Sequence, residues 1–536
     1  MSARPTTGGM SHRQVLESMT GLMLSMFVSM LSSTVVSNAL PRILHDLRGG
    51  ESAYTWVVAA TLLTTTASTP LWGKFADLVS KKLLMQLAIL VFIASSVVAG
   101  LSQSVGMLIG CRAVQGIGAG GILAMTQVIM AAMVSPRERG RYSGYLGATF
   151  AVATITGPLV GGVIVDTPWL GWRWCFYVGV PFAGAALLVL QKTLHLPVHR
   201  RQLRVDYLGA AFLTGGVSVL LIWVSLAGQR FAWMSLATLL MVVAGVGLLA
   251  AAAVVERRAV EPIIPLELFR HRTVSLATAA GLCVGLAMFG ATIFLAQYFQ
   301  IARGASPTLS GLQSMPMILG LATASLVTGR LVSTTGRWKR YLLGGTITAT
   351  VGFGLLGTMN GSTSFVLVAI YMTLVGIGLG MTTQNLVLSV QNTVAPRDLG
   401  AATATISFFR SLGGAIGVSA LGAILAHRVA HLTTEGLARS GLSAPGVGRA
   451  GSDIPNVALL PDAIARIVEH AYGQGVGHIF LVATPLMALS VLFVAFIKEV
   501  PLRRHSGTEL MEQLERGGAA GEVSGGVVEH VAGARR

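Results

Sequence analysis

The most constraining feature of this sequence is an internal repeat, because residues 112–162 recur in degraded form 260 positions later. Glycines occupy the paired positions, namely Gly116, Gly118 and Gly120 with Gly376, Gly378 and Gly380, Gly140 with Gly400, Gly157 with Gly417, and Gly162 with Gly422. The turn Pro136–Glu138 recurs as Pro396–Asp398. So many matches at one constant offset predict two similar half-domains that arose by duplication.

Composition places these two halves in a membrane. Hydrophobic residues make up 53% of the 536 residues and charged residues only 11%, whereas a soluble protein carries about 25% charged residues. The three cysteines all fall in apolar runs, so we expect no disulfide framework. Duplicated halves in an apolar chain are a common plan of membrane transporters. The sequence therefore predicts an all-α, polytopic membrane protein.

A membrane-spanning helix needs about 20 apolar residues. Fourteen runs satisfy this requirement: 15–40, 53–73, 83–102, 106–134, 141–165, 174–191, 206–228, 232–255, 274–299, 310–332, 341–359, 364–391, 402–427 and 477–497. The first run is too long for a signal-peptide core, so we expect it to remain as a spanning helix.

The spacing of the runs predicts the organisation of the chain. We expect an N-terminal tail, a six-helix bundle, a linker with two extra spanning helices, a second six-helix bundle and a disordered tail, at 1–14, 15–191, 192–273, 274–498 and 499–536. Within the second bundle, a Gly- and Ser-rich loop is expected outside the cell at 427–476, with one short helix at 461–472.

Basic residues indicate the orientation. Of the 38 Lys and Arg residues, 27 fall in the tails or the even-numbered connections, nine on the opposite side and two within spans. The positive-inside rule therefore predicts that both termini are cytoplasmic. Because most basic residues are arginine, we expect a GC-rich bacterial genome and hence a bacterial cytoplasmic membrane.

One predicted helix of the first half carries small residues on a single face. Ala153, Gly157 and Gly161 are spaced by four, and Gly162 follows them, so another helix can approach closely. Pro158 lacks an amide hydrogen and crowds the carbonyl of the preceding turn, which predicts a kink. A kinked helix with a small face suits a joint between two moving halves. Ordinary glycine-rich packing is the alternative.

Two arginines fall inside predicted spans. Arg112, followed by Gln115 and Gly116, lies about 9 Å from the outer end of its span at 1.5 Å per residue. An arginine at that depth is costly unless it faces a partner or a wet cavity, so it is a candidate functional residue. Arg410 is similarly placed from the inner end of its span. The alternative for both is a side chain that reaches the membrane surface.

The connection between the second and third spans contains an acid. Gly73 and Asp77 follow a G-x-x-x-D spacing, and Lys81 and Lys82 come four and five positions after the acid. A carboxylate beside helix termini can latch neighbouring helices through charge and dipole contacts. The positive-inside rule would explain the lysines but not Asp77.

Together these motifs resemble the signatures of the major facilitator superfamily. Three groups of residues look like the three signature motifs of that family: Gly73/Asp77/Lys81/Lys82, Arg112/Gln115/Gly116 and Gly157/Pro158/Gly161/Gly162. The third group is similar to the motif of drug/proton antiporters. The segments 33–41, 172–181 and 297–316 look like the fourteen-helix branch of multidrug exporters. The resemblance implies two six-helix bundles around a central cavity, alternating access, and export of amphipathic drugs in exchange for protons.

The chain departs from this family where relatives usually carry a proton-coupling acid. The usual L-D-x-T of the first span is L-S-S-T at 31–34, and none of the 21 acids falls in the middle of a span. Buried carboxylates are the common proton carriers of transporters. The carrier is therefore unassigned, and Asp77 and Asp166 are the candidates.

Uncharged polar residues are expected in the interior instead. Without the acid, Arg112 should find a neutral hydrogen-bonding partner in the first span, namely Ser32, Ser33 or Asn38. In a later span, Gln384, Asn385 and Gln391 interrupt an otherwise apolar run, and their expected place is the interior rather than lipid.

The first span also offers a candidate wall for the substrate cavity. Met23, Met26, Met30 and Thr34 recur at spacings of three and four, which places them on one helix face. Methionine is polarizable and adaptable, which suits varied apolar ligands. A lipid-facing or core-packed stripe is an equally good interpretation of the same spacing.

Other classes of function find little support in the sequence. A nucleotide-driven pump would need a G-x-x-x-x-G-K-[ST] loop, which the sequence lacks. An enzyme would need clustered His, Cys or carboxylates within the spans, so we expect no catalytic, metal or cofactor site. The expected partners are a small amphipathic substrate, protons and lipid, not nucleic acid, and we expect a monomer. The alternative within transport is a dedicated exporter of one self-made metabolite or lipid.

Overall fold

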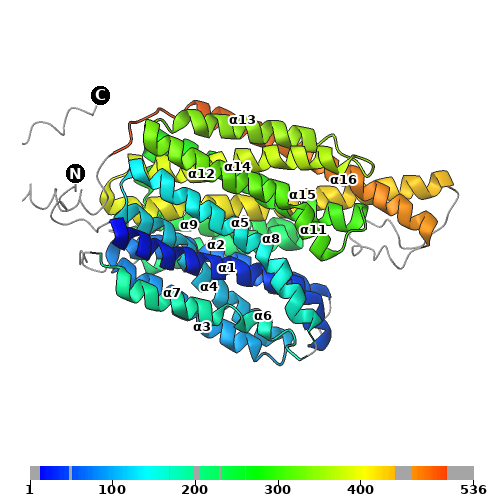
Figure 1. Ribbon diagram of the computed structural model, residues 1–536, viewed down its shortest axis with the longest axis horizontal. Helices are drawn as coiled ribbons and strands as arrows, with labels where there is room; N and C mark the ends of the chain where they lie inside the picture. The colour runs from blue at the N-terminus through cyan, green and yellow to red at the C-terminus, as the bar shows by residue number, and fades with distance from the viewer. Residues whose placement is uncertain are drawn as a thin grey trace, which may run out of the picture.

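The computed structural model describes residues 12–47, 51–167, 169–196, 206–227, 231–232, 234–259, 261–440 and 461–503. Within them, long helices run side by side (Figure 1): α1 (His12–Asp46), α2 (Glu51–Leu78), α3 (Lys81–Gly100), α4 (Val105–Met133), α5 (Pro136–Asp166), α7 (Val180–Thr193), α8 (Tyr207–Leu226), α9 (Leu236–Glu256), α10 (Arg272–Gln297), α12 (Met315–Thr335), α13 (Lys339–Leu356), α14 (Phe365–Thr393), α15 (Leu399–Ser440) and α16 (Asp462–Ala495). Shorter helical segments are α6 (Trp174–Tyr177), η1 (Leu266–Arg270), η2 (Tyr298–Ala302), α11 (Pro307–Gln313) and η3 (Pro396–Asp398). Apart from one isolated bridge between Ala227 and Phe231, all regular structure in these residues is helical.

Each of the fourteen predicted spans coincides with a helix, and the run 174–191 is divided between α6 and α7. By length and composition, twelve helical segments of the described chain are able to cross a membrane. α2, which carries the polar run 64–69, and α13 fall outside that set, but α2 packs along α4 and α13 along α14. The prediction of an all-α membrane fold is confirmed.

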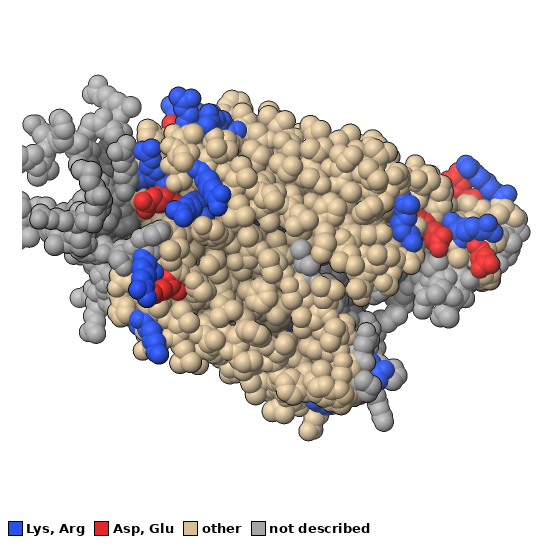
Figure 2. All heavy atoms as spheres, viewed as in Figure 1, with Lys and Arg blue, Asp and Glu red and all other residues tan. Residues whose placement is uncertain are grey.

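The helices form two groups that follow the repeat. In Figure 1 the blue-to-cyan helices of the first half lie below the green-to-orange helices of the second half. α8 and α9 pack against each other, and α8 also lies against α2 and α15. α1 begins and α16 ends at the same end of the molecule, which we call the basic end. Figure 2 shows charged side chains gathered toward the two ends, with a broad uncharged band between them.

The repeated glycines make equivalent contacts in both halves. A methyl group added at Gly118 would lie 2.7 Å from a backbone nitrogen of α3, and one added at Gly378 would meet the backbone of α13. Gly120 and Gly380 approach α2 and α12 in the same way. Lipid offers helices little hydrophobic gain on association, so they pack through small residues that bring backbones together. The duplication in the sequence thus builds two similar bundles.

α15 and α16 extend past the bundles at the end opposite the basic end (Figure 1). α15 continues to Ser440 and α16 starts at Asp462, while the residues that join them lie outside the described part of the chain. The projecting parts approach each other where Gly436 faces Ile467. The sequence predicts only one short helix here, at 461–472, whereas the structure has helix on both sides of the join.

Candidate functional site: the contacts between the two bundles

At the basic end, α2 of the first bundle packs against α15 of the second. Gly73 and Gly400 face each other, and a methyl group added at Gly73 would lie 2.7 Å from the carbonyl oxygen of Gly400. One turn further along α2, the Asp77 carboxylate accepts hydrogen bonds of 2.8 Å from the backbone N–H groups of Gly400 and Ala401. In the first turn of a helix such N–H groups lack internal partners, and the helix dipole favours a negative charge. Asp77 therefore caps a helix of the other bundle.

A second interface at this end joins α5 and α12, and it repeats the first with the halves exchanged. Gly329 of α12 faces Gly140 of α5, which is the counterpart of Gly400 in the sequence repeat. A methyl group added at Gly140 would lie 2.6 Å from the carbonyl oxygen of Gly329. Neither contact leaves room for a side chain, so both interfaces require glycine for backbone to meet backbone.

The two interfaces differ in charge. Ser333 lies four residues after Gly329, as Asp77 lies four residues after Gly73. Ser333 carries no charge, and its backbone oxygen accepts a hydrogen bond of 3.4 Å from the Arg137 guanidinium. The α2–α15 interface is therefore held by a carboxylate at a helix N-terminus, whereas the α5–α12 interface has no carboxylate at the equivalent position.

A buried arginine adds a third contact between the bundles. Arg139, in the first turn of α5, is 2% exposed and donates to the carbonyl oxygens of Ala131 and Val134 at 2.8 and 3.0 Å. It also donates to Gln391 Oε1 of α14 at 2.6 Å. Gln391 Nε2 donates in turn to Thr403 Oγ1 of α15 at 3.1 Å. This chain of hydrogen bonds ties the start of α5 to two helices of the second bundle.

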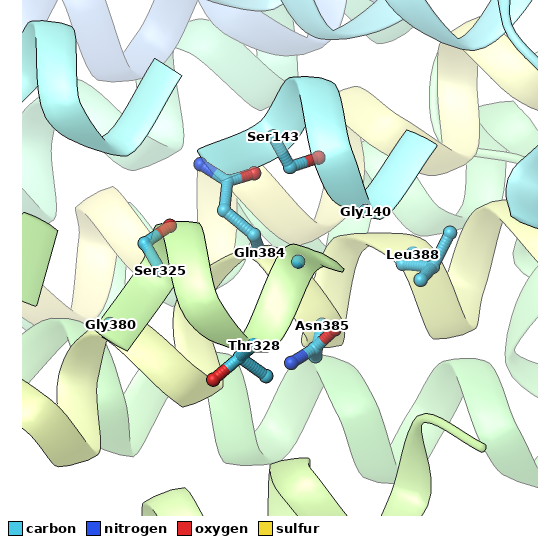
Figure 3. Close-up of a pocket in the computed structure, with 9 residues that line it drawn as sticks. Gly140, Ser143, Ser325, Thr328, Gly380, Gln384, Asn385 and Leu388 are labelled. Carbon is cyan, nitrogen blue, oxygen red and sulfur yellow. The ribbon is translucent and has the colours of Figure 1, made fainter. Parts of the chain in front are cut away.

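A small polar pocket lies among α5, α12 and α14 (Figure 3). Its lining combines glycines with hydroxyl and amide side chains: Gly140, Ser143, Ser325, Thr328, Gly329, Gly380, Gln384, Asn385 and Leu388. The pocket has room for about one water molecule. Gln384 points from α14 toward α5, and its amide oxygen accepts a hydrogen bond of 3.4 Å from Gln127 of α4. The structure thus places Gln384 and Asn385 between the bundles.

The lysines near Gly73 bind their own bundle and the linker. Lys82 Nζ donates to the carbonyl oxygen of Gln191, at the end of α7, at 2.7 Å, and Lys81 beside it is half-buried. Lys74 is buried and forms an ion pair of 2.5 Å with Glu261, in the connection between α9 and α10. The linker is thereby fixed to α2 beside the first interface.

One face of α14 is buried toward the basic end and open toward the other end. Gln384 and Gln391 lie on this face and contact the first bundle. The same face continues outward at spacings of three and four residues, through Ile377, Thr373, Ile370 and Val366. Val366 is 64% exposed and Ile370 is 50% exposed, and both line an apolar groove of about 360 Å³. The contacts between the bundles described so far thus lie toward the basic end, whereas at the opposite end this face of α14 is exposed and α11 still contacts α5.

Arg112 lies in a neutral hydrogen-bond network inside the first bundle. Its side chain is 2% exposed and donates to Gln115 Oε1 at 2.6 Å. Gln115 Nε2 donates in turn to the hydroxyls of Ser96 on α3 at 2.7 Å and Ser32 on α1 at 3.3 Å. The sequence predicts a direct contact between Arg112 and α1, whereas in the structure Gln115 lies between them. The oxygen of the Gln115 amide accepts from the guanidinium, and its NH₂ group donates to the hydroxyls. Ser33 is exposed.

The glycines at 116 and 157 pack inside the first bundle. A methyl group added at Gly116 would lie 2.5 Å from the carbonyl oxygen of Thr61 on α2, and Gly157 faces Thr34 of α1. The Gly157 face therefore does not form the predicted joint between the halves. On α5 that joint is made nearer the basic end, by Gly140.

Two further glycines of the predicted motif follow on α5. Gly161 is buried, whereas a methyl group added at Gly162 would meet no atom within 4 Å. Three other predicted site residues belong to α1 and α5, but their side chains lie outside the described part of the structure: Asn38, Pro158 and Asp166.

The methionine stripe of α1 does not form a single cavity wall. Met26 is 7% exposed and belongs to the apolar core of the first bundle, against which Met23 packs. Met30 is half-buried, and the Thr34 hydroxyl donates to the Leu31 carbonyl oxygen of its own helix at 2.9 Å. The core-packed interpretation therefore applies to Met23 and Met26.

Arg410 lies on α15, two turns outward from Thr403 and on the same helix face. No residue of α15 between 399 and 425 is exposed, so this stretch is surrounded by other helices. The Arg410 side chain is half-buried, and within the described chain it forms no hydrogen bond or ion pair. This position favours the interior of the molecule over the membrane surface.

Comparison with known proteins settles the family. Residues 22–418 match the family described as Major Facilitator Superfamily. The chain belongs to the major facilitator superfamily. It is 35% identical over 493 residues to the uncharacterized MFS-type transporter Rv1877 of Mycobacterium tuberculosis, covering 90% of this chain and 69% of that protein. It is 33% identical over 431 residues to the multidrug transporter protein MdtP of Bacillus subtilis, covering 80% and 78%.

Solved structures of major facilitator proteins share the fold at low identity. The human organic anion transporter MFSD10 superposes with a TM-score of 0.60 at 15% identity, covering 90% of this chain and 99% of that chain. The proton:xylose symporter XylE superposes with a TM-score of 0.61 at 14% identity, covering 94% and 99%. Major facilitator proteins are transporters, so the expectation that this chain is not an enzyme is confirmed.

The contact between Arg139 and Gln391 at this major facilitator site is not predicted by the sequence. Arg139 was counted only as a basic residue of a connection, although it follows the turn that the repeat duplicates. Gln391 was noticed only as a polar residue in an apolar run. One signal could have paired Arg139 with Gln391. Gln391 is a polar side chain at the end of a span of the second half, and Arg139 is a basic residue at the start of a span of the first half.

Proposed function

We propose that this major facilitator protein exports amphipathic compounds across the cytoplasmic membrane by alternating access, in exchange for protons. The observation that carries the proposal is the pair of glycine interfaces, Gly73 with Gly400 and Gly140 with Gly329, which close one end of the gap between the bundles. Relatives called multidrug transporter MdtP and efflux pump dotC of Dothistroma septosporum support export, the latter at 32% identity over 502 residues, with coverage of 92% of this chain and 85% of that protein.

The sign of the charges supports the orientation. Lys and Arg are concentrated at the basic end, so by the positive-inside rule this end faces the cytoplasm of a bacterial cell. The conformation described above is then the outward-open stage of the cycle. To take up the next substrate molecule, both glycine interfaces must separate while contacts form at the opposite end. We infer that one chain is sufficient for this cycle.

Asp77 is the proton carrier that the geometry supports best. Its carboxylate accepts hydrogen bonds from two backbone N–H groups of α15, and these bonds are stronger to the charged form than to the neutral acid. Protonation would weaken the cap and release α15, which links proton entry to opening of the cytoplasmic end. Asp166, at the end of α5, is the second candidate of the sequence analysis.

A dedicated exporter of one self-made metabolite is the alternative. It is supported by a relative described as an acurin A biosynthesis cluster MFS-type transporter of Aspergillus aculeatus, which is 30% identical over 503 residues. A strain that overproduces this protein separates the two: resistance to many chemically unrelated dyes and antibiotics supports multidrug export, whereas resistance to none of them supports the alternative.

Purified protein in proteoliposomes tests export and coupling together. With the lumen acidified, protons leave the vesicle, so an antiporter should accumulate fluorescent dyes in the vesicles against their gradient. Nigericin collapses the proton gradient and should abolish accumulation, and protein-free liposomes serve as the control. Accumulation that persists after nigericin would contradict proton exchange, and absence of any dye flux would contradict multidrug export.

A further inference from the structure

The middle of the predicted spans carries positive charge without negative charge. Arg112 and Arg410 both fall inside spans, whereas none of the 21 acids lies in the middle of one. Near the closed end, Asp77 accepts hydrogen bonds from backbone N–H groups, and Glu261 forms an ion pair with Lys74. Arginine stays protonated in proteins, so the two guanidinium groups give the interior a net positive charge.

Arg112 has a hydrogen-bonding group that the protein leaves unused. Its guanidinium is buried, its side-chain partner is a neutral amide, and among the residues that the structure describes its Nε–H has no partner. A buried cation with only neutral partners is costly, and the cost falls when an anion approaches it. An intramembrane arginine of this kind marks a substrate or ion pathway by default.

Arg410 is the more accessible of the two arginines. It lies about 10 Å outward from Thr403, at 1.5 Å per residue, and Thr403 belongs to the hydrogen-bond chain that closes the cytoplasmic end. Its side chain is half-buried and unpaired within the described chain, and no residue of the surrounding stretch of α15 is exposed. The interior of the second bundle therefore holds a guanidinium that has no partner in the described chain, two turns outward from the hydrogen bonds that join the bundles.

An apolar surface lies further outward on α14. The groove on α14 is lined by Phe365, Val366, Ala369, Ile370, Thr373 and Leu374, and it continues the helix face that carries Gln384. A planar guanidinium fork matches a carboxylate, and an apolar groove matches a hydrocarbon body.

We propose that the exported compounds are amphipathic anions, whose acidic group is bound by the interior arginines and whose apolar body passes along the exposed face of α14 on its way out. This inference rests on the proposed export function and adds its substrate class. A cation would be repelled by both arginines, and a neutral compound would leave their charge uncompensated.

Three probes with one apolar body and different charge test the inference. Binding of 2-naphthoate, 2-naphthamide and 2-naphthylmethylamine to the protein in nanodiscs is measured by calorimetry, with empty nanodiscs as the blank. We expect naphthoate to bind about tenfold more tightly than naphthamide and the amine to bind most weakly. Equal binding of the three, tightest binding of the amine, or binding of none would overturn the inference.

Variants assign the selectivity to the arginines. Arg410→Gln should weaken naphthoate binding about tenfold and change naphthamide binding less than about twofold. Arg428→Gln removes a charge from an exposed position further along the same helix and should change neither. Ser32→Asp places a carboxylate in the Arg112 network and should weaken naphthoate binding while strengthening amine binding. Unchanged naphthoate binding in both Arg410→Gln and Ser32→Asp would overturn the assignment.

The proteoliposome experiment distinguishes failure of this inference from failure of the proposed function. If cationic or neutral dyes accumulate against a gradient while naphthoate does not bind, the proposed export function is supported and the anionic substrate class is contradicted. If no dye accumulates and no probe binds, both the export function and the anionic substrate class are contradicted.

Discussion

Replacing Gly329 with valine is expected to reduce transport at least about a hundredfold while the protein still folds. A side chain at this position would run into the backbone of Gly140, and neither backbone can move without separating α12 from α5. Overpacking of this kind destabilises a packed contact by about 3 kcal/mol. Here it destabilises only the conformation in which the cytoplasmic end is closed. The variant should therefore remain open to the cytoplasm.

Dye accumulation in proteoliposomes measures this effect, and the elution profile and thermal stability of the purified protein report folding. Gly247→Val on α9 is the matched control, because a methyl group at Gly247 would meet no atom within 4 Å. Normal transport by Gly329→Val would show that the α5–α12 contact is not needed for closure.

The second large effect is expected at Arg139. Arg139→Gln loses hydrogen bonds to two carbonyl oxygens and to Gln391, and it should reduce transport about a hundredfold and lower thermal stability. Gln391→Leu removes the contact between the bundles and the bond to Thr403 but leaves the two carbonyl contacts of Arg139. It should reduce transport about tenfold with a smaller loss of stability than Arg139→Gln, since a hydrogen bond to a charged group is worth about 1.5–3 kcal/mol.

A double-mutant cycle checks that the two residues act through one bond. Because the bond is shared, the double variant should be no worse in transport than Arg139→Gln alone. Strictly additive losses would mean that Arg139 and Gln391 act separately, and that the hydrogen bond between them does not hold the closed end.

The fold could be predicted from the sequence because membrane helices leave strong local signals. Each span is an apolar run whose backbone must satisfy its own hydrogen bonds, so length and hydropathy locate it. The constant offset between repeated glycines made the two bundles visible before any contact was known. Gly73 and Asp77 also stand out in the sequence, because the positive-inside rule explains the neighbouring lysines but not an acid at this spacing.

Contacts between distant helices could not be predicted in the same way. The spacing of Met23 and Met26 gives a helix face but not the direction of that face, and the face proved to be core. Gly157 and Gly140 lie on one helix, and only the packing shows that Gly157 meets α1 whereas Gly140 meets the other bundle. The partner of Arg139 lies 252 positions away, so no local pattern connects them.

The central claim is that the two ends of the gap open and close in alternation, and distances between spin labels test it most directly. After replacement of the three native cysteines, one label pair at Glu138 and Arg337 spans the cytoplasmic end, and a second at Gln103 and Ser362 spans the opposite end, all four positions being exposed. With substrate and low pH, the first pair should gain a longer distance population while the second gains a shorter one. If both pairs keep a single unchanged distance under conditions in which the same protein transports, alternating access through these interfaces is contradicted.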